Sequence, residues 1–190
     1  MINKEQRAVF ELKLFLPYEF QCSGNRSSEK FSLPAPEEEL EQIRRSIGAE
    51  QLEQCHIVIL ASAIPCLMDY LPQTYELKEL NAFAYALVGQ DMISSEEKTE
   101  KLLAALEAEL PDDMGTALEI AERLEQYEIL PDSIQSPKDY AAYVLERENI
   151  HVDEKISPFV DYESFGYYHT KKDGAVQTSR GLILRKDHPM

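Results

Sequence analysis

The sequence contains few of the residue patterns from which enzyme and metal sites are usually built. Its three cysteines, Cys22, Cys55 and Cys66, show no short paired spacing, so they predict neither a disulfide framework nor a zinc site. A glycine-rich phosphate loop, a serine elbow and an HExxH pattern are all missing, and the four histidines lack metal-ligand spacing. We therefore expect no enzymatic activity, no metal and no cofactor.

Long apolar segments are also missing. The first ten residues contain no apolar run after a basic segment, so they do not predict a signal peptide. The longest apolar run, residues 57–68, is interrupted by Ser62 and Pro65 and is too short to cross a bilayer. The sequence therefore predicts a soluble, cytoplasmic protein in a reducing compartment, with no membrane partner.

Basic side chains are scarce relative to acidic ones. The chain has 19 Lys and Arg against 35 Asp and Glu, a net charge of −16. Residues 91–154 alone hold eighteen acidic and five basic side chains, a local balance of −13. Such a field repels nucleic acid and anionic membranes and attracts basic partners. Direct nucleic-acid binding is therefore not expected, although acidity for solubility alone would give the same composition.

The apolar periodicity predicts an α+β protein, elongated, with two or three small domains in a row and a helix-rich acidic middle and C-terminal part. Val9–Leu16 alternates as a strand does, and the continuous apolar run His56–Ala61 predicts a strand covered on both faces. Asp173–Gly174 is a hairpin-turn signal. Further strands are predicted at 31–33 and 182–184, and helices at 37–47, 75–88, 96–110, 115–126 and from Ser136–Pro137, with a helical turn near 159–168.

Gly89–Ser95 is the clearest predicted domain boundary, because a glycine ends one helical pattern and Ser95 can cap the next. We expect an N-terminal α+β domain over residues 1–90. An acidic helical domain over 91–134 and a C-terminal α+β domain over 135–190 complete the predicted organisation. Within the acidic helices, Leu102, Leu103, Leu106 and Leu110 are expected to face inward.

Two segments resemble the ArdA-type antirestriction proteins of mobile elements, particularly those of Gram-positive bacteria. The first is ALEIAERLEQYEILPDSIQSPKDYAAYVLERENI, residues 117–150, and the second is PFVDYESFG, residues 158–166. A weaker similarity lies at residues 75–81. Where the family has a basic residue and then an acid after the motif glycine, this chain has Tyr167 and Tyr168. The family motif is matched in kind by Asp161, Tyr162, Glu163, Phe165 and Gly166.

The resemblance implies a non-catalytic, acidic mimic of B-DNA. Such a protein would be a homodimer without a cofactor, and it would occupy the basic DNA-binding groove of a type I restriction-modification enzyme. Duplex DNA carries about one negative charge per 1.7 Å of axis, and acidic residues three or four apart on a helix lie about 5–6 Å apart. The candidate partner-binding surface consists of Glu96, Glu100, Glu107, Glu119, Glu122, Glu125, Glu128, Asp132, Asp139 and Glu146.

Other interpretations stay open at this point. Each carboxylate of the candidate surface could be an ordinary solvated helix side chain, so the hypothesis concerns the set. The chain could instead be an acidic protein–protein interaction adaptor without DNA mimicry, or a small enzyme with an unrecognised carboxylate site. The aromatic residues Tyr162, Phe165, Tyr167 and Tyr168 could form the core of a small terminal domain or contribute to a dimer contact.

Overall fold

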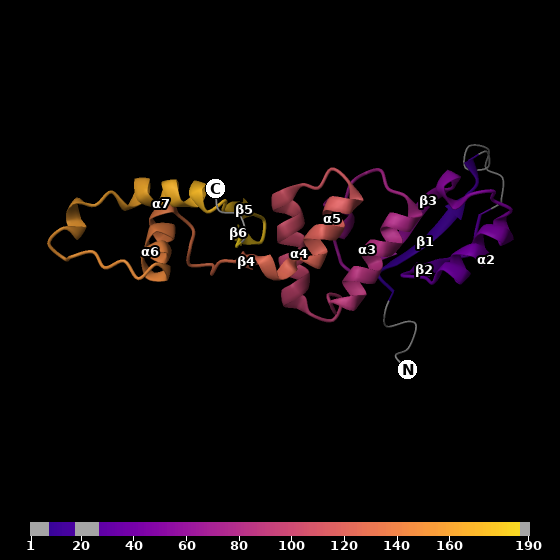
Figure 1. Cartoon of the computed structure of the whole chain (residues 1–190), viewed down its shortest axis with the longest axis horizontal. Coiled ribbons are helices and arrows are strands. Elements are labelled where there is room, and N and C mark those ends of the chain that lie inside the picture. Colours follow the sequence, from indigo (N-terminus) through magenta and orange to yellow (C-terminus); the bar gives the residue numbers. More distant parts are fainter. Residues whose placement is uncertain (1–7, 18–26, 187–190) are drawn as a thin grey trace. The chain divides into compact units, whose positions relative to one another are not determined.

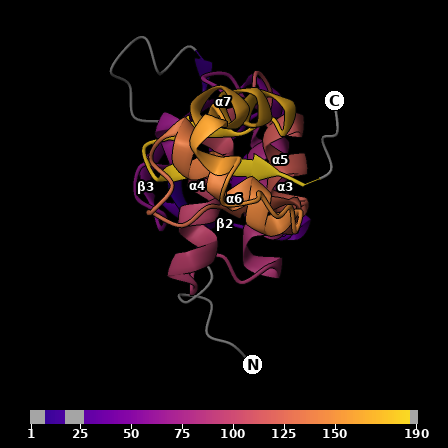
Figure 2. The ribbon, with the colours of Figure 1, turned by 90° about the vertical axis from the view of Figure 1, so that its left-hand side faces the viewer.

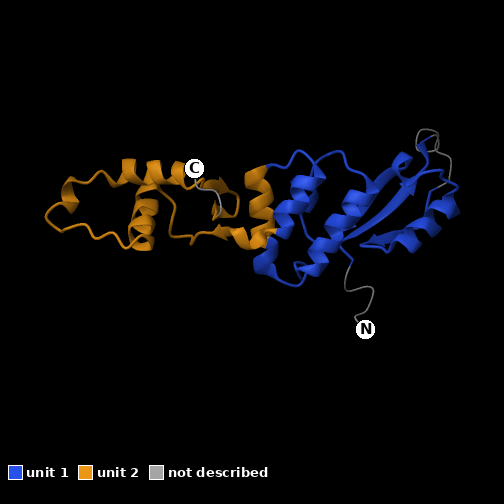
Figure 3. Cartoon of the chain, viewed as in Figure 1, with its two compact units in different colours: residues 1–99, 110–122 blue, residues 100–109, 123–190 orange. Residues whose placement is uncertain are grey.

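The computed structural model describes residues 8–17 and 27–186, and it has the predicted α+β class (Figure 1). Two compact units divide the chain (Figure 3): unit 1 comprises residues 1–99 and 110–122, and unit 2 comprises 100–109 and 123–190. Helix α4 (Glu96–Glu109) contributes to both units. The predicted domain boundaries near residues 90 and 134 stay a prediction. In the described ranges, no helix combines the length and the apolar character that a membrane crossing requires.

Unit 1 contains an antiparallel sheet with β1 in its centre. β1 (Phe10–Phe15) pairs with β2 (Phe31–Leu33) on one side and with β3 (His56–Ser62) on the other. Phe10, Leu12 and Leu14 are fully buried, and the residues between them are half-buried. The alternation in the sequence therefore predicted this strand correctly. Of the face that it indicated, Leu12 and Leu14 are buried, whereas Leu16 lies beyond the end of β1 and is half-buried.

The expectation that β3 is covered on both faces was wrong. None of its seven residues is buried, and Leu60 is 42% exposed. β3 lies at the edge of the described sheet, and a register shift opposite Glu11 and Leu12 interrupts its pairing with β1. A continuous apolar run is thus compatible with a half-covered edge strand as well as with a central one.

The helices of unit 1 largely follow the predicted pattern. α2 (Glu37–Ile47) has the predicted bounds and ends at Gly48, whose φ of 71° is a left-handed conformation that glycine adopts at little cost. α3 (Leu77–Gly89) begins later than expected. Its N-cap is Glu76, which forms a reciprocal capping box with Glu79.

α5 (Met114–Glu122) packs against α3 in unit 1 and is shorter than predicted. The sequence predicted one helix over 115–126, but the chain leaves the helix after Glu122 and forms the short 3-10 helix η4 (Leu124–Gln126). The next strand, β4 (Tyr127–Ile129), pairs with β6 (Gly181–Arg185), and Leu124 and Tyr127 are buried. Sheet pairing and apolar burial therefore override the helical pattern.

Unit 2 combines a small sheet with two packed helices. β4 and β5 (Val176–Thr178) flank β6 (Gly181–Arg185), and both pairs are antiparallel. α6 (Pro137–Arg147) begins at the predicted cap Ser136. α7 (Tyr162–Lys172) is a full helix where only a helical turn was predicted. Figures 1 and 2 show α6 next to α7. Tyr140 and Val144 of α6 belong to the hydrophobic core of this unit.

Two further expectations in this part of the chain were wrong. Leu110 does not face inward: it follows the end of α4 with a φ of 47° and is 70% exposed. Asp173–Gly174 does not form a hairpin turn, because Asp173 caps the C-terminus of α7 and Gly174 adopts a φ of 64° just beyond it. The hairpin instead joins β5 to β6 through Ser179 and Arg180.

Candidate functional site: an acidic surface

The ten carboxylates of the candidate surface are divided between the two units. Glu96 lies in the first turn of α4, and Glu119 and Glu122 lie on α5; these three belong to unit 1. The other seven belong to unit 2. Counted over the sequence, unit 1 has nine basic and twenty acidic side chains, a net charge of −11, and unit 2 has ten and fifteen, a net charge of −5.

The three unit 1 carboxylates are all solvent-exposed. On α5 the buried side chains Ala117, Ile120 and Ala121 face the protein interior, which leaves Glu119 and Glu122 on the outside. A separation of three residues on a helix corresponds to about 5–6 Å between β-carbons. Within residues 8–17 and 27–186, neither side chain makes an ion pair, so both negative charges face water.

Glu100 and Glu107 have a different environment. Arg180, from the β5–β6 hairpin, approaches both: its Nε lies 2.8 Å from Glu100 Oε2 and its Nη1 lies 3.4 Å from Glu107 Oε2. Glu107 also accepts hydrogen bonds from the backbone N–H of Ser179, at 2.7 Å, and from its hydroxyl, at 2.6 Å. These contacts hold the hairpin against α4. They also neutralise much of the negative charge of the two glutamates within unit 2.

Two more carboxylates of unit 2 meet cations from β6 and the residue after it. Lys186 Nζ lies 3.2 Å from Glu128 Oε2. Arg185 Nη1 lies 3.6 Å from Glu109 Oε1, which also accepts a hydrogen bond from the Tyr127 hydroxyl at 3.0 Å. Glu128 belongs to the candidate surface, and its ion pair reduces the negative charge that it presents.

Asp139 has a helix-capping role. Its Oδ2 accepts hydrogen bonds from the N–H of Ser136 at 2.9 Å and from the Ser136 hydroxyl at 2.6 Å, and Ser136 in turn accepts from the Asp139 N–H. These hydrogen bonds, the Ser136 hydroxyl first among them, lower the pKa of Asp139 below its usual value. The carboxylate therefore stays charged, but it is directed toward the start of its own helix.

The remaining members of unit 2, Glu125, Asp132 and Glu146, are exposed, and none of them forms an ion pair in the part of the chain that the structure describes. Together with Glu96, Glu119 and Glu122 they form the uncommitted set, which is the subset of the candidate surface that can present full charge to a partner. The sequence could not separate Glu100, Glu107 and Glu128 from this subset, because the cations that bind them lie at residues 180–186. The only sequence signal was the positive balance of residues 155–190.

The family-motif residues have local structural roles. Asp161 caps α7 by accepting hydrogen bonds from the N–H and the hydroxyl of Ser164, at 3.0 and 2.7 Å, and the backbone bond is the main cause of its lowered pKa. The Tyr162 hydroxyl lies 2.8 Å from the Ser157 hydroxyl. Phe165 packs against the core cluster of unit 2, and Glu163 is exposed.

Gly166 allows α6 and α7 to approach closely. A β-carbon at this position would lie 1.7 Å from the carbonyl oxygen of Pro137, at the start of α6. The aromatic group divides in the structure: Phe165 joins the core, whereas Tyr167 and Tyr168 are exposed, at 56% and 61%. The core interpretation therefore applies to Phe165, and a role for the exposed pair in a dimer stays a prediction.

No group of three or more His, Cys, Asp and Glu side chains in the described ranges is arranged to hold a metal ion. Neither a protein-family model nor a curated protein matches the chain.

Proposed function

We propose that the protein is a DNA-mimic antirestriction protein, whose acidic surface occupies the DNA-binding groove of a type I restriction-modification enzyme. The observation that carries the proposal is the uncommitted set: six exposed carboxylates of the candidate surface that make no ion pair among the described residues. The similarity of residues 117–150 and 158–166 to ArdA-type proteins supports the same conclusion.

The proposed recognition is electrostatic. Glu119 and Glu122 lie three residues apart on α5, so their negative charges are a few ångströms apart, as are those of neighbouring phosphates of duplex DNA. A basic groove lined by Lys and Arg would attract this surface, accelerate its association and release it at high salt. No catalytic group or cofactor is needed, because the inhibitor acts by excluding DNA.

A homodimer would extend the charged surface, since two copies present two uncommitted sets. The exposed Tyr167 and Tyr168 on α7 supply aromatic area of the type that is enriched in protein interfaces. In this proposal the dimer acts in the cytoplasm, where restriction-modification enzymes meet incoming DNA.

The test is a cleavage assay with a purified type I restriction enzyme, unmodified DNA and the full chain. We expect inhibition that is relieved when a short duplex without the recognition sequence is added as competitor. Inhibition that the duplex leaves unchanged would contradict occupation of the DNA groove. It would instead favour the acidic adaptor, which binds a basic patch away from DNA. Failure to inhibit any of several type I enzymes would contradict the antirestriction activity and leave the adaptor as the remaining interpretation.

A further inference from the structure

An open groove of about 770 Å³ lies in unit 1, between the beginnings of α2 and α3 and the short 3-10 helix η2 (Leu52–Gln54). Its apolar lining comes from Leu40, Leu52 and Leu77, and Tyr85 presents a ring that is 48% exposed. The volume falls within the range of natural ligand sites, about 300–1,000 Å³. None of these residues belongs to the candidate acidic surface.

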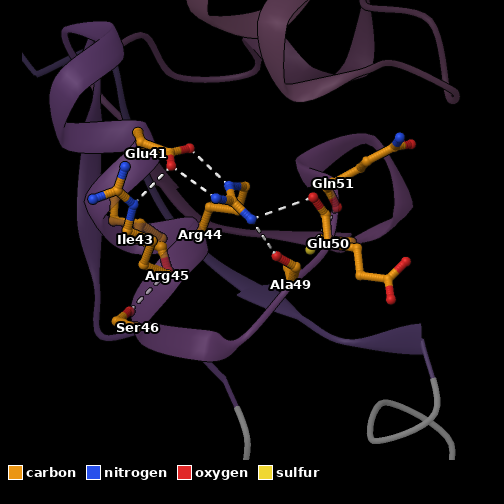
Figure 4. Close-up of polar contacts among 9 residues, drawn as sticks. Glu41, Ile43, Arg44, Arg45, Ser46, Ala49, Glu50 and Gln51 are labelled. Atoms are coloured by element: carbon orange, nitrogen blue, oxygen red, sulfur yellow. Dashed lines mark hydrogen bonds and ion pairs between the residues drawn. The ribbon is translucent and has the colours of Figure 1, made fainter.

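Hydrogen bonds from opposite sides hold the walls of the groove. The Asn81 side chain on α3 accepts from the N–H of Ala35 at 2.8 Å and donates to its carbonyl at 2.9 Å, which ties the start of α2 to α3. Arg44 donates to the carbonyls of Ala49 and Glu50, at 2.7 and 3.3 Å, and so fixes the turn that leads into η2 (Figure 4). The groove is thus preformed, which lowers the cost of ordering it on binding.

The rim of the groove is acidic. Glu37, Glu38 and Glu53 line it and are exposed, and the only lysine or arginine among the residues lining it is Lys78. A fourth carboxylate, Glu41, is already bound by Arg44 through two contacts of 2.7 Å and by Arg45 at 2.8 Å (Figure 4). Three carboxylates are therefore available to a ligand, beside an apolar floor and the face of one tyrosine.

We propose that this groove binds a protein segment in which lysine or arginine alternates with leucine-sized apolar residues. The carboxylates of the rim would pair with its cations, and the leucines of the floor would cover its apolar side chains. The Tyr85 ring offers a face over which a guanidinium or ammonium group can lie. Because the groove is open to solvent and not an enclosed cavity, a continuous chain can pass through it.

This inference does not depend on the proposed antirestriction activity. It concerns residues 35–85, and its readout is peptide binding, so either proposal can fail without the other.

The experiment titrates the full chain with the peptide acetyl-Lys-Arg-Leu-Lys-Arg-Leu-amide and follows backbone amide NMR shifts. A second peptide, in which serine replaces both leucines, has the same charge and tests the apolar floor. We expect the largest shifts at the residues that line the groove, and binding of the leucine peptide about tenfold tighter than that of the serine peptide.

Variants separate the groove from general attraction of a polycation to an acidic protein. The groove triple variant combines Glu37→Lys, Glu38→Lys and Glu53→Lys. It should lower the affinity for the leucine peptide about tenfold, as expected for the loss of three exposed ion pairs. Tyr85→Ala should weaken it about threefold. A matched triple, Glu29→Lys, Glu50→Lys and Asp69→Lys, makes the same charge change at exposed positions outside the groove lining and should bind nearly as the wild type does.

Three results would overturn the inference: shifts that spread over the acidic helices and spare the groove, equal affinity for the two peptides, or equal weakening by the two triple variants. Circular dichroism and thermal melting confirm that each variant is folded before it is titrated. Lys78→Glu tests for a gain of binding. Because it replaces the cation of the rim by a carboxylate, it should raise the affinity for the leucine peptide.

Discussion

Unit 1 carries a net charge of −11 and unit 2 carries −5, yet the larger part of the candidate surface lies in unit 2. Within the candidate surface, several carboxylates of unit 2 are paired with cations, whereas those of unit 1 make no ion pair among the described residues. In unit 2, Arg180, Arg185 and Lys186 approach glutamates of α4 and β4, whereas Glu119 and Glu122 of unit 1 face water. A dense run of acidic residues in the sequence therefore does not by itself produce unpaired negative charge on the surface, because cations from distant segments can neutralise part of it.

The close packing of α6 on α7 gives the largest expected effect in unit 2. Gly166→Ala would place a methyl group against the carbonyl of Pro137, where backbone has to move, so we expect a loss of about 3 kcal/mol in the free energy of unfolding. Chemical denaturation measures the loss. The control is Gly89→Ala at the end of α3 in unit 1, where the added carbon meets nothing within 4 Å. Equal stability of the two variants would contradict the close approach.

The charge cluster of the β5–β6 hairpin gives the next largest effect. Arg180 is largely buried, with 17% of its side chain exposed, and its removal takes away the guanidinium that faces Glu100 and the half-buried Glu107. We expect Arg180→Ala to cost about 1–3 kcal/mol in urea denaturation. Arg45→Ala in unit 1 removes an ion pair whose arginine is 73% exposed and should cost less than about 1 kcal/mol. A larger loss of stability in Arg45→Ala than in Arg180→Ala would contradict the stronger role of the half-buried charge cluster in unit 2.

The smallest expected effect is a change in the pKa of one carboxyl group of unit 1, that of Glu41. Hydrogen bonds from Arg44 and then Arg45 lower its pKa to about 2, below the usual 4.5 of a glutamate. A folded-state pKa below the unfolded one means that the interaction stabilises the protein above about pH 4.5 and is lost as pH falls toward 2.

Carbon NMR of the Glu41 carboxyl group measures this pKa directly. In Arg44→Gln it should rise toward 4.5, and in Arg45→Gln it should rise less, because Arg44 is the larger cause. An unchanged pKa in Arg44→Gln would show that the contacts in Figure 4 do not hold the carboxylate in solution.

Local sequence signals predicted the elements whose determinants are local. The bounds of α2 follow from an acidic first turn and from Gly48, and the start of α6 follows from Ser136 and Pro137. The predictions were wrong where contacts with residues distant in the sequence determine the end of an element or its burial. The end of α5 depends on the pairing of β4 with β6, and the exposure of β3 depends on its place at the sheet edge.

The candidate site follows the same rule. Helical spacing identified Glu119 and Glu122 as outward-facing, as the structure places them. It could not show that Glu107 would accept hydrogen bonds from Ser179, seventy-two residues away, because no local pattern encodes that contact. The helix predicted over 115–126 would carry Glu119, Glu122 and Glu125 three residues apart on its outside, but α5 ends at Glu122, which leaves Glu125 in η4 and in unit 2.

The most direct test of the central claim measures inhibition of a type I restriction enzyme by the triple variant Glu119→Lys, Glu122→Lys and Glu125→Lys. The account predicts that half-inhibition needs about tenfold more of this variant than of wild type. The Glu29, Glu50 and Asp69 triple, with the same net charge, should inhibit nearly as wild type does. Full inhibition by the folded acidic-surface variant would contradict the assignment of these carboxylates to the partner-binding surface.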